Sequence, residues 1–378
     1  MKRIVPILLA VLFSLSVLTL VGCGNINDSD VVILWMDEGV ATNPNSLINS
    51  MDRAMYIEKV GYTHMGAKGS AEEQLKQAKQ AVDGGCAALV VELINPLDAQ
   101  EIVDYAKAKD IPVVFINTTQ LLPAGVVDSY DKCAVVTADL TTVAEVQGEL
   151  VADYVKSNFK KLDKNTDGKI TYFAYDLGVI SAPAVKKANE LLATEDYIVK
   201  NAKKEKINTS VELADVSLED LIKVDPTEYE LILTADDKTA FGVLQQLQEK
   251  DYNTNKLTTH FVPVITVGDS MDYKAYVAEQ GADKYEENKY LVDLTVVSEE
   301  DLAEMIYTTR NVVGAGRLAG TVVSDDDAIA GAVAQIVRNM IKEKDMFESV
   351  ASKVKEGEAA SVTVEGKTVK VRYISFTE

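Results

Sequence analysis

Residues 70–92 read SAEEQLKQAKQAVDGGCAALVVE, a stretch in which an amphipathic helix leads into a buried strand. Ser70 and Glu73 form a capping box at the start of the helix, and Gly84-Gly85 ends it. The apolar run at 87–91 lacks the polar alternation of a half-exposed strand, so it predicts a parallel strand covered on both faces. A helix joined to such a strand is the repeating unit of an α/β fold.

The same alternation continues along the chain. Further short apolar runs occupy residues 31–36, 112–116, 134–136, 170–174, 231–233 and 262–267. Amphipathic segments predict helices from Asp98 to the residue before Ile111, at 137–159 and at 237–250. Because 378 residues exceed what one core usually supports, we expect an α/β protein with two doubly wound parallel-sheet lobes.

The chain begins with a basic pair, Lys2-Arg3, followed by a mostly apolar stretch at 4–21. It continues to Leu20-Val21-Gly22-Cys23, the pattern of a lipoprotein signal that is cut before an acylated cysteine. A transmembrane anchor is the alternative, since about 18 apolar residues can span a bilayer. The small residues at the cleavage point favour a signal peptide at 1–22 and a tether that begins at the lipidated Cys23 and runs to residue 30. We therefore expect an extracytoplasmic protein, lipid-anchored to the cell membrane on its periplasmic or outer surface.

The formal net charge of −21 at pH 7 disfavours binding to nucleic acid and to anionic lipid surfaces. After the leader the sequence has two more cysteines, Cys86 and Cys133, and each precedes an apolar run. Both are therefore interpreted as small buried residues. A disulfide between them is left open, because sequence alone does not settle pairing.

Catalytic motifs are absent from the sequence. The two histidines, His64 and His260, accompany no Ser or Cys nucleophile motif. The segment at 314–319 fits a loose dinucleotide fingerprint but follows a helical stretch rather than a strand, which is the wrong context. We expect a binding protein with no catalytic residues; a secreted hydrolase on the same fold is the alternative.

Side chains that carry oxygen atoms gather where the predicted strands end, which is where ligands bind in such sheets. They are Asp37, Glu38, Glu92, Asn117, Tyr175, Asp176, Asp236, Asp269 and Ser324. Carboxylates accept hydrogen bonds from hydroxyl groups, so this set suits a neutral polyol such as a sugar, and it suits a cationic ligand too. For any single residue, capping of the following helix is the alternative role.

Trp35 is the one tryptophan of the chain and follows the apolar run that begins at Val31. It is either a core aromatic at the end of a sheet or a stacking platform for the apolar face of a pyranose. The sequence leaves both interpretations open.

The segment at 163–171 resembles a calcium-binding loop of the EF-hand type. Its candidate ligands are Asp163, Asn165 and Asp167 at positions one, three and five, the carbonyl of Lys169 and the hydroxyl of Thr171. Gly168 allows the sharp turn, but position twelve is Ala174 instead of the usual glutamate. An Asx-rich turn before a strand is the alternative.

With this loop the sequence resembles the galactose/glucose-binding members of the type I periplasmic binding protein family. The family completes the loop with a distant glutamate before a later strand, and Glu230 stands at the matching place, which implies a structural calcium ion. Further matching segments are 111–117, 128–132, 147–148, 318–322 and 369–373. The resemblance covers most of the chain after the leader.

The resemblance implies two lobes joined by a three-segment hinge that close on a sugar. The N-terminal lobe would comprise 31–138 and 324–363, and the C-terminal lobe 139–323 and 364–378. Proteins of this kind are monomers that deliver their ligand to the membrane permease of an ABC importer. Some also present the ligand to a chemoreceptor or a sensor kinase, which is the alternative function.

The sequence departs from the family pattern in its pocket. Lys187 falls where the family has an arginine, and it cannot make the same planar two-pronged contact. Glu92, Asp236 and Ser324 each fall where the family has an amide, and a segment at 271–301 has no family counterpart. We therefore expect the pocket's location to carry over without the galactose or glucose preference, which leaves nucleosides and cations as alternative ligands.

Overall fold

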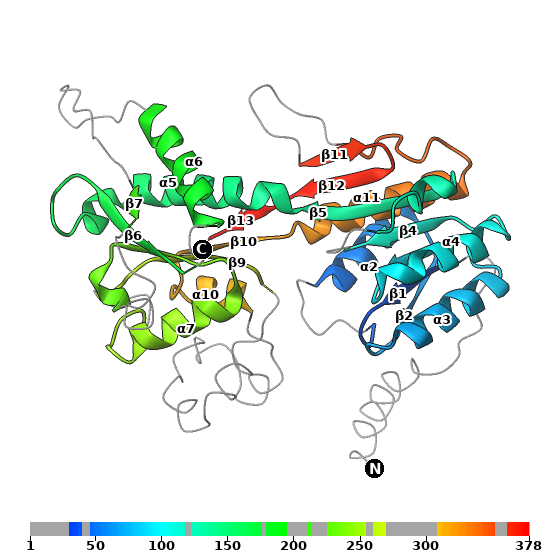
Figure 1. Cartoon of the computed structure of the whole chain (residues 1–378), viewed down its shortest axis with the longest axis horizontal. Coiled ribbons are helices and arrows are strands. Elements are labelled where there is room, and N and C mark those ends of the chain that lie inside the picture. Colours follow the sequence, from blue (N-terminus) through cyan, green and yellow to red (C-terminus); the bar gives the residue numbers. More distant parts are fainter. Residues whose placement is uncertain are drawn as a thin grey trace, which may run out of the picture. The chain divides into compact units, whose positions relative to one another are not determined.

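The computed structural model describes residues 30–39, 46–117, 122–175, 179–194, 211–213, 225–254, 260–269, 308–351 and 361–377 (Figure 1). The predicted signal peptide at 1–22, Cys23, Asp176 and the added segment at 271–301 lie outside these ranges. Across the ranges that are described, no helix combines the length and the apolar character needed to cross a bilayer.

Seven strands form the first sheet, in the spatial order β11-β12-β5-β4-β3-β1-β2. Their bounds are β1 (Val31–Trp35), β2 (Tyr62–Gly66), β3 (Ala88–Glu92), β4 (Val113–Ile116), β5 (Cys133–Asp139), β11 (Val362–Glu365) and β12 (Thr368–Arg372). Strands β1 to β5 pair in parallel, whereas β11 and β12 form an antiparallel hairpin that turns at Gly366.

Six strands form the second sheet, in the spatial order β13-β10-β9-β8-β6-β7. Their bounds are β6 (Ile170–Ala174), β7 (Val211–Leu213), β8 (Leu231–Leu233), β9 (Val264–Val267), β10 (Gly320–Val323) and β13 (Ile374–Phe376). All neighbours pair in parallel except β13, which runs antiparallel to β10.

The longer helices connect the strands. They are α2 (Leu47–Glu58), α3 (Ala71–Asp83), α4 (Ala99–Lys107), α5 (Val143–Leu162), α6 (Ser181–Thr194), α7 (Asp237–Gln248), α10 (Thr309–Gly314) and α11 (Asp326–Ile341). The start of α3 follows the predicted cap, because the Ser70 side chain accepts a hydrogen bond from the Glu73 N–H.

The second sheet is covered on both faces, as a doubly wound fold requires. Alternate residues of each strand point to opposite sides. On one side Tyr172 and Leu231 pack with α5 and α6, and on the other Phe173 and Ile232 pack with α7. In the first sheet all five residues of β1 are 2% exposed or less, and Cys86 and Cys133 lie in the adjoining core without a disulfide.

Each of the seven predicted apolar runs contains a strand, which confirms the α/β class. The predicted helix at 137–159 is wrong at its start, because β5 continues to Asp139 and α5 begins at Val143. Asp139 accepts a hydrogen bond from the Thr141 N–H and so opens a short 3₁₀ turn between the two elements. The strands from β1 to β10 pair in parallel, as predicted, and the last three strands add antiparallel pairs.

By its contacts the chain separates into two compact units. One comprises Met1–Val40, Asp52–Val136 and Val333–Glu348, and the other comprises Ala41–Met51, Thr137–Ala332 and Ser349–Glu378. Each unit carries a set of polar side chains at the carboxyl ends of its strands.

Candidate functional site at the carboxyl ends of the strands

In the first unit, Glu92 joins three neighbouring strand ends. Its Oε1 accepts a hydrogen bond from Asn117 Nδ2 over 2.8 Å, and its Oε2 accepts one from the Met36 N–H over 3.4 Å. Burial raises the pKa of Glu92, and the nearby Asp37 carboxylate adds to the rise, although the bonds from Asn117 and Met36 oppose it. The structure thus brings together Asp37, Glu92 and Asn117, which the sequence predicted as ligand residues.

The turn that carries Asp37 and Glu38 lies against β2 because residue 66 has no side chain. A Cβ on Gly66 would come within 2.2 Å of the Glu38 carbonyl carbon. Asp37 closes the turn by accepting a hydrogen bond from the Gly39 N–H over 3.0 Å. Both acidic side chains remain exposed at this edge.

Trp35 is 2% exposed, so its ring is buried within the first unit. The indole Nε1 donates a hydrogen bond to His64 Nδ1 over 2.8 Å, and His64 Nε2 lies 2.8 Å from Asp52 Oδ1. A ring that is enclosed in this way has no face open for stacking on a sugar, so the packing favours the core interpretation.

In the second unit, Asp236 caps a helix. Its carboxylate accepts two hydrogen bonds from Thr239, one from the N–H and one from the hydroxyl, each over 2.8 Å. The neighbouring Asp237 is buried, and it accepts a hydrogen bond from Thr309 Oγ1. Both oxygens of Asp236 therefore serve the start of α7.

Asp269 follows β9 and binds the first turn of α10. One carboxylate oxygen accepts a hydrogen bond from the Arg310 N–H over 2.8 Å, and the other lies 2.9 Å from Arg310 Nε. Burial raises the pKa of Asp269, although Thr308 and Arg310 act against it.

Two residues after β10 complete this edge. Ser324 Oγ donates a hydrogen bond to Asp326 Oδ1 over 2.6 Å. Burial raises the pKa of Asp326 to about 6, while Ser324 and Arg310 oppose the rise. Asp269 and Ser324 were predicted from the sequence as ligand residues, whereas Arg310 and Asp326 were not. A sequence signal existed for Asp326, because it is a further acidic residue after an apolar segment. No such signal existed for Arg310, which lies on a six-residue helix without clear periodicity.

Tyr175 and Lys187 lie in other surroundings. The Tyr175 ring packs edge-on against Phe173 at 4.7 Å between centroids, and burial raises its pKa to about 12. Lys187, on α6, lies 3.1 Å from Glu145 of α5. Within the described residues, neither side chain forms a hydrogen bond or ion pair with Asp269, Arg310 or Asp326.

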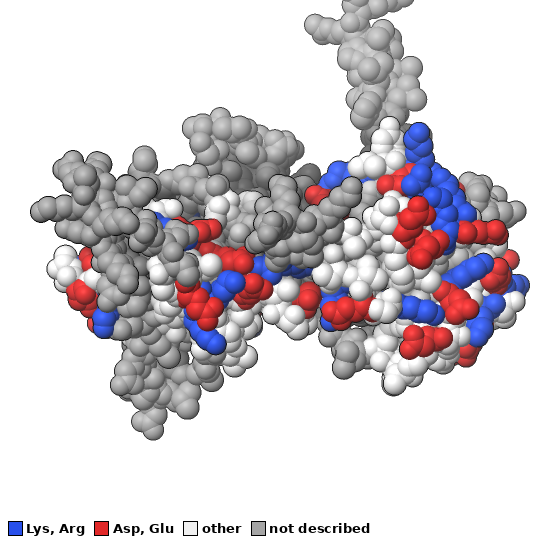
Figure 2. Space-filling model, turned by 90° about the horizontal axis from the view of Figure 1, so that it is seen from above, with Lys and Arg blue, Asp and Glu red and all other residues white. Residues whose placement is uncertain are grey.

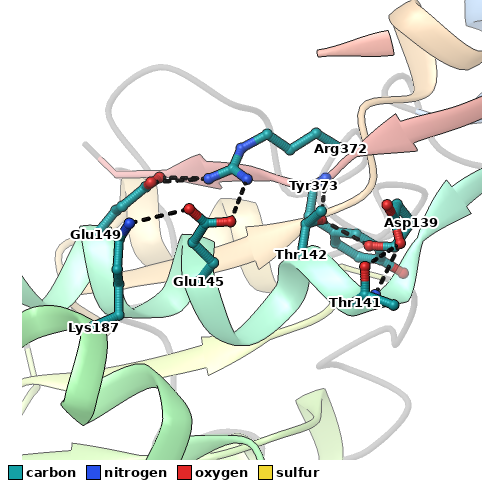
Figure 3. A network of polar contacts seen from close by, with 8 residues as sticks. All are labelled: Asp139, Thr141, Thr142, Glu145, Glu149, Lys187, Arg372 and Tyr373. Carbon is teal, nitrogen blue, oxygen red and sulfur yellow. Dashed lines mark hydrogen bonds and ion pairs between the residues drawn. The ribbon is translucent and has the colours of Figure 1, made fainter. Parts of the chain in front are cut away.

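Arg372, at the end of β12, fastens the start of α5 (Figure 3). Its Nη1 lies 2.9 Å from Glu145, and its Nη2 donates to both carboxylate oxygens of Glu149 over 2.9 Å. The bond from Arg372 is the main reason that the pKa of Glu145 is lowered, with Lys187 as a second cation.

Beside this network, two chain segments that are far apart in sequence are joined directly (Figure 3). The Tyr373 N–H donates to Thr142 Oγ1 over 3.1 Å, and the same hydroxyl donates to the Asp139 carbonyl over 2.7 Å. The link between β5 and α5 therefore lies against the link between β12 and β13.

The calcium-like loop is closed by hydrogen bonds to its own backbone. Asp163 accepts from the N–H groups of Asp167 and Gly168, each over 3.1 Å. Glu230, 4% exposed, accepts from the Lys164 and Thr171 N–H groups, each over 2.8 Å. The structure thus places Glu230 at the loop, as the resemblance implied.

Oxygen donors of this kind suit calcium in their chemistry. Asn165 accepts from the Asp167 N–H, Asp167 accepts from the Lys169 N–H, and Gly168 has a positive φ of 79°. However, no three acidic, histidine or cysteine side chains among the described residues are grouped as a metal site.

Figure 2 shows acidic and basic side chains interspersed over the visible face of the described residues, rather than segregated into a basic area.

Residues 53–345 match the family model for the periplasmic binding protein domain. The chain belongs to this family. A segment of 88 residues is 38% identical to the D-galactose/methyl-galactoside binding periplasmic protein MglB of Haemophilus influenzae and covers 23% of this chain and 26% of that protein. The match thus spans about a quarter of that relative's length.

The arabinose-binding protein AraP of Geobacillus stearothermophilus is similar in structure. Its TM-score is 0.50 at 13% sequence identity, over 93% of this chain and 97% of AraP, which shows the fold alone. For this periplasmic binding protein, the type I fold and the family resemblance predicted from the sequence are both confirmed.

Proposed function

We propose that this periplasmic binding protein captures a monosaccharide-type sugar outside the cytoplasmic membrane and delivers it to an ABC importer. The observation that carries the proposal is the placement of oxygen-bearing and amide side chains at the carboxyl ends of the strands in each unit. Glu92 and Asn117 represent the first unit, and Asp269, Ser324 and Asp326 represent the second.

The chemistry of these side chains fits a polyol. Sugar hydroxyls donate hydrogen bonds to carboxylates and accept them from amide and guanidinium groups. The names of two similar proteins also support a sugar: one binds D-galactose or methyl-galactoside and the other binds arabinose. The family supports an extracytoplasmic location, and Cys23 is the proposed point of lipid attachment.

A cationic ligand is the second candidate. Within the described part of the first unit, no cation pairs with Glu92, and Asp37 lies near it. Protonated amines are therefore included among the ligands to be tested. Presentation of the ligand to a chemoreceptor or kinase uses the same binding chemistry; uptake of labelled sugar by a deletion strain would distinguish transport from sensing.

We also propose a structural calcium ion at the 163–171 loop. Asp163, Asn165, Asp167 and Glu230 would supply side-chain oxygens, with Thr171 and the Lys169 carbonyl beside them. The ion would stabilise the second unit and take no part in ligand capture.

Calorimetry of the purified protein tests the sugar proposal directly. The panel comprises D-galactose, D-glucose, L-arabinose, D-ribose, adenosine and putrescine, and mass spectrometry identifies any ligand retained from the cell. We expect saturable binding of one neutral sugar per chain, weakened at least tenfold by Glu92→Gln. Glu101→Gln is the matched control, because Glu101 pairs with Lys79 on the surface of the same unit. If no sugar binds and none copurifies, the proposal is wrong; binding of putrescine alone would establish the cationic candidate.

A further inference from the structure

Arg310 is a cation at the carboxyl edge of the second sheet, and its side chain is held in place from two sides. Asp269 accepts a hydrogen bond from its backbone N–H and forms an ion pair with its Nε over 2.9 Å, without hydrogen-bond geometry, and the ring centroid of Phe376 lies 5.6 Å from its guanidinium carbon. The side chain is 18% exposed. This arrangement fixes the orientation of the guanidinium group before any ligand arrives.

The outer nitrogens of Arg310 have no partner among the described residues. Among the residues that the structure describes, none accepts a hydrogen bond from Nη1 or Nη2, since Asp269 approaches only the N–H and Nε. An arginine that served only to fasten α10 to β9 would need no more than these two contacts. Its remaining donors are therefore free to recognise a ligand.

Asp326 provides the complementary acceptor. One of its oxygens accepts from Ser324 Oγ over 2.6 Å, and no described residue donates to the other. Arg310 is near enough to act electrostatically on the Asp326 carboxylate, as is Asp269. The Arg310 guanidinium, as a preorganised donor, and the second Asp326 oxygen, as an acceptor, thus lie at the same carboxyl edge of the second sheet.

A hydroxyl group satisfies both partners, because it accepts a hydrogen bond from a guanidinium and donates one to a carboxylate. A carboxylate on the ligand could accept from Arg310 but has no proton to donate to Asp326, and an ammonium could donate to Asp326 but cannot accept from Arg310, so of the three groups only a hydroxyl satisfies both partners. We propose that Arg310 and Asp326 together bind hydroxyl groups of the ligand and select a neutral polyol over its amino and acidic analogues. This inference rests on the proposed function and names its specificity determinants.

The test compares wild type, Arg310→Lys, Asp326→Asn and the control Arg338→Lys by calorimetry. Arg338 pairs with Glu58 in the first unit, so the control also removes one guanidinium from an ion pair. The ligands are D-galactose, L-arabinose, their monodeoxy analogues, galactosamine and galacturonic acid. Thermal melting of each variant is measured in parallel.

We expect Arg310→Lys and Asp326→Asn each to weaken binding of the neutral sugar at least tenfold, with Arg338→Lys unchanged. For one monodeoxy analogue, wild type and Arg310→Lys should bind within twofold of each other, because the hydroxyl that Arg310 contacts is already missing. Asp326→Asn should also reduce the preference for the neutral sugar over galacturonic acid.

Three results would overturn the inference. Equal sugar binding by wild type and both variants would remove only this proposal, leaving sugar capture intact. A uniform loss by Arg310→Lys across every deoxy analogue, accompanied by a lower melting temperature, would make Arg310 a purely structural anchor. If wild type binds no sugar of the panel, the proposed function fails, and this inference fails with it.

Discussion

The indole Nε1 of Trp35 donates a hydrogen bond to Nδ1 of His64, although the two residues are 29 positions apart. Strands β1 and β2 are parallel neighbours, and their register places His64 beside Ile33, two residues before Trp35. Because Nδ1 accepts, the ring proton of neutral His64 belongs on Nε2, where it donates to Asp52. The single tryptophan is thereby fixed in the core of the first unit.

Replacing His64 should show how much the hydrogen bond between Trp35 and His64 contributes to the free energy of unfolding. His64→Phe would leave the buried Trp35 N–H without an acceptor, so we expect the free energy of unfolding to fall by about 1–3 kcal/mol. Urea denaturation followed by tryptophan fluorescence measures the change. His260→Phe is the control, because it retains a ring that stacks on Tyr252. An unchanged midpoint for His64→Phe would mean that the Trp35 bond contributes nothing.

Gly148 should resist even the smallest side chain. In an open helix Gly→Ala stabilises by up to about 1 kcal/mol. At this position on α5, however, a Cβ would lie 2.4 Å from the Ala184 carbonyl oxygen and 2.8 Å from Lys187 Cβ of α6. The two helices would have to separate, so we expect a net loss of roughly 1–3 kcal/mol in Gly148→Ala.

Gly331 of α11 offers the matched control for that substitution. No atom lies within 4 Å of the position that its Cβ would occupy, so Gly331→Ala should keep or raise stability. Thermal melting compares the two variants. Equal effects would contradict the close packing of α5 on α6.

The stability of the protein should depend on pH through Asp326. Its pKa is raised from 3.8 to about 6, so between these values the folded state holds a proton that the unfolded state releases. Stability from this group therefore falls as pH rises through that window and is fully lost above about 6. We expect Asp326→Asn to be more stable than wild type at pH 7, by about 3 kcal/mol, and similar to it near pH 4.

The difference in unfolding free energy between wild type and Asp326→Asn reports on Asp326 alone, because groups with lowered pKa values are the same in both proteins. Glu145, for example, has a lowered pKa and loses its contribution as pH falls, but it does so equally in both proteins. Denaturant titrations at several pH values provide the measurement. A gain in stability together with weaker sugar binding is expected where a buried carboxylate is kept for ligand recognition. A pH-independent difference would contradict the assignment.

Calcium should matter for stability if the 163–171 loop binds it. Removing calcium with a chelator should lower the melting temperature, because an ion that binds the folded state stabilises it. Asp167→Ala should abolish this response, whereas Asp153→Ala, an exposed position on α5, should preserve it. Identical melts with and without chelator would leave a turn closed by Glu230 and backbone N–H groups.

Much of the fold could be predicted because parallel strands that are buried on both faces have continuous apolar sequences. Strands with partly exposed residues were not predicted, for the opposite reason: β12 reads TVKVR with alternate residues buried, and the edge strand β2 is only half-buried throughout. Residues such as Glu92 and Asp269 were found because they end apolar runs. Arg310 was missed, since its position at the sheet edge depends on a contact with Asp269, 41 residues earlier.

The hydrogen bond from the Tyr373 N–H to Thr142 couples the link between β5 and α5 to the link between β12 and β13. Torsions that change around Asp139 to Thr142 must be matched by torsions at Arg372 and Tyr373, or this bond and the Arg372 ion pairs break. A substitution in either of these two segments should therefore alter the flexibility of both.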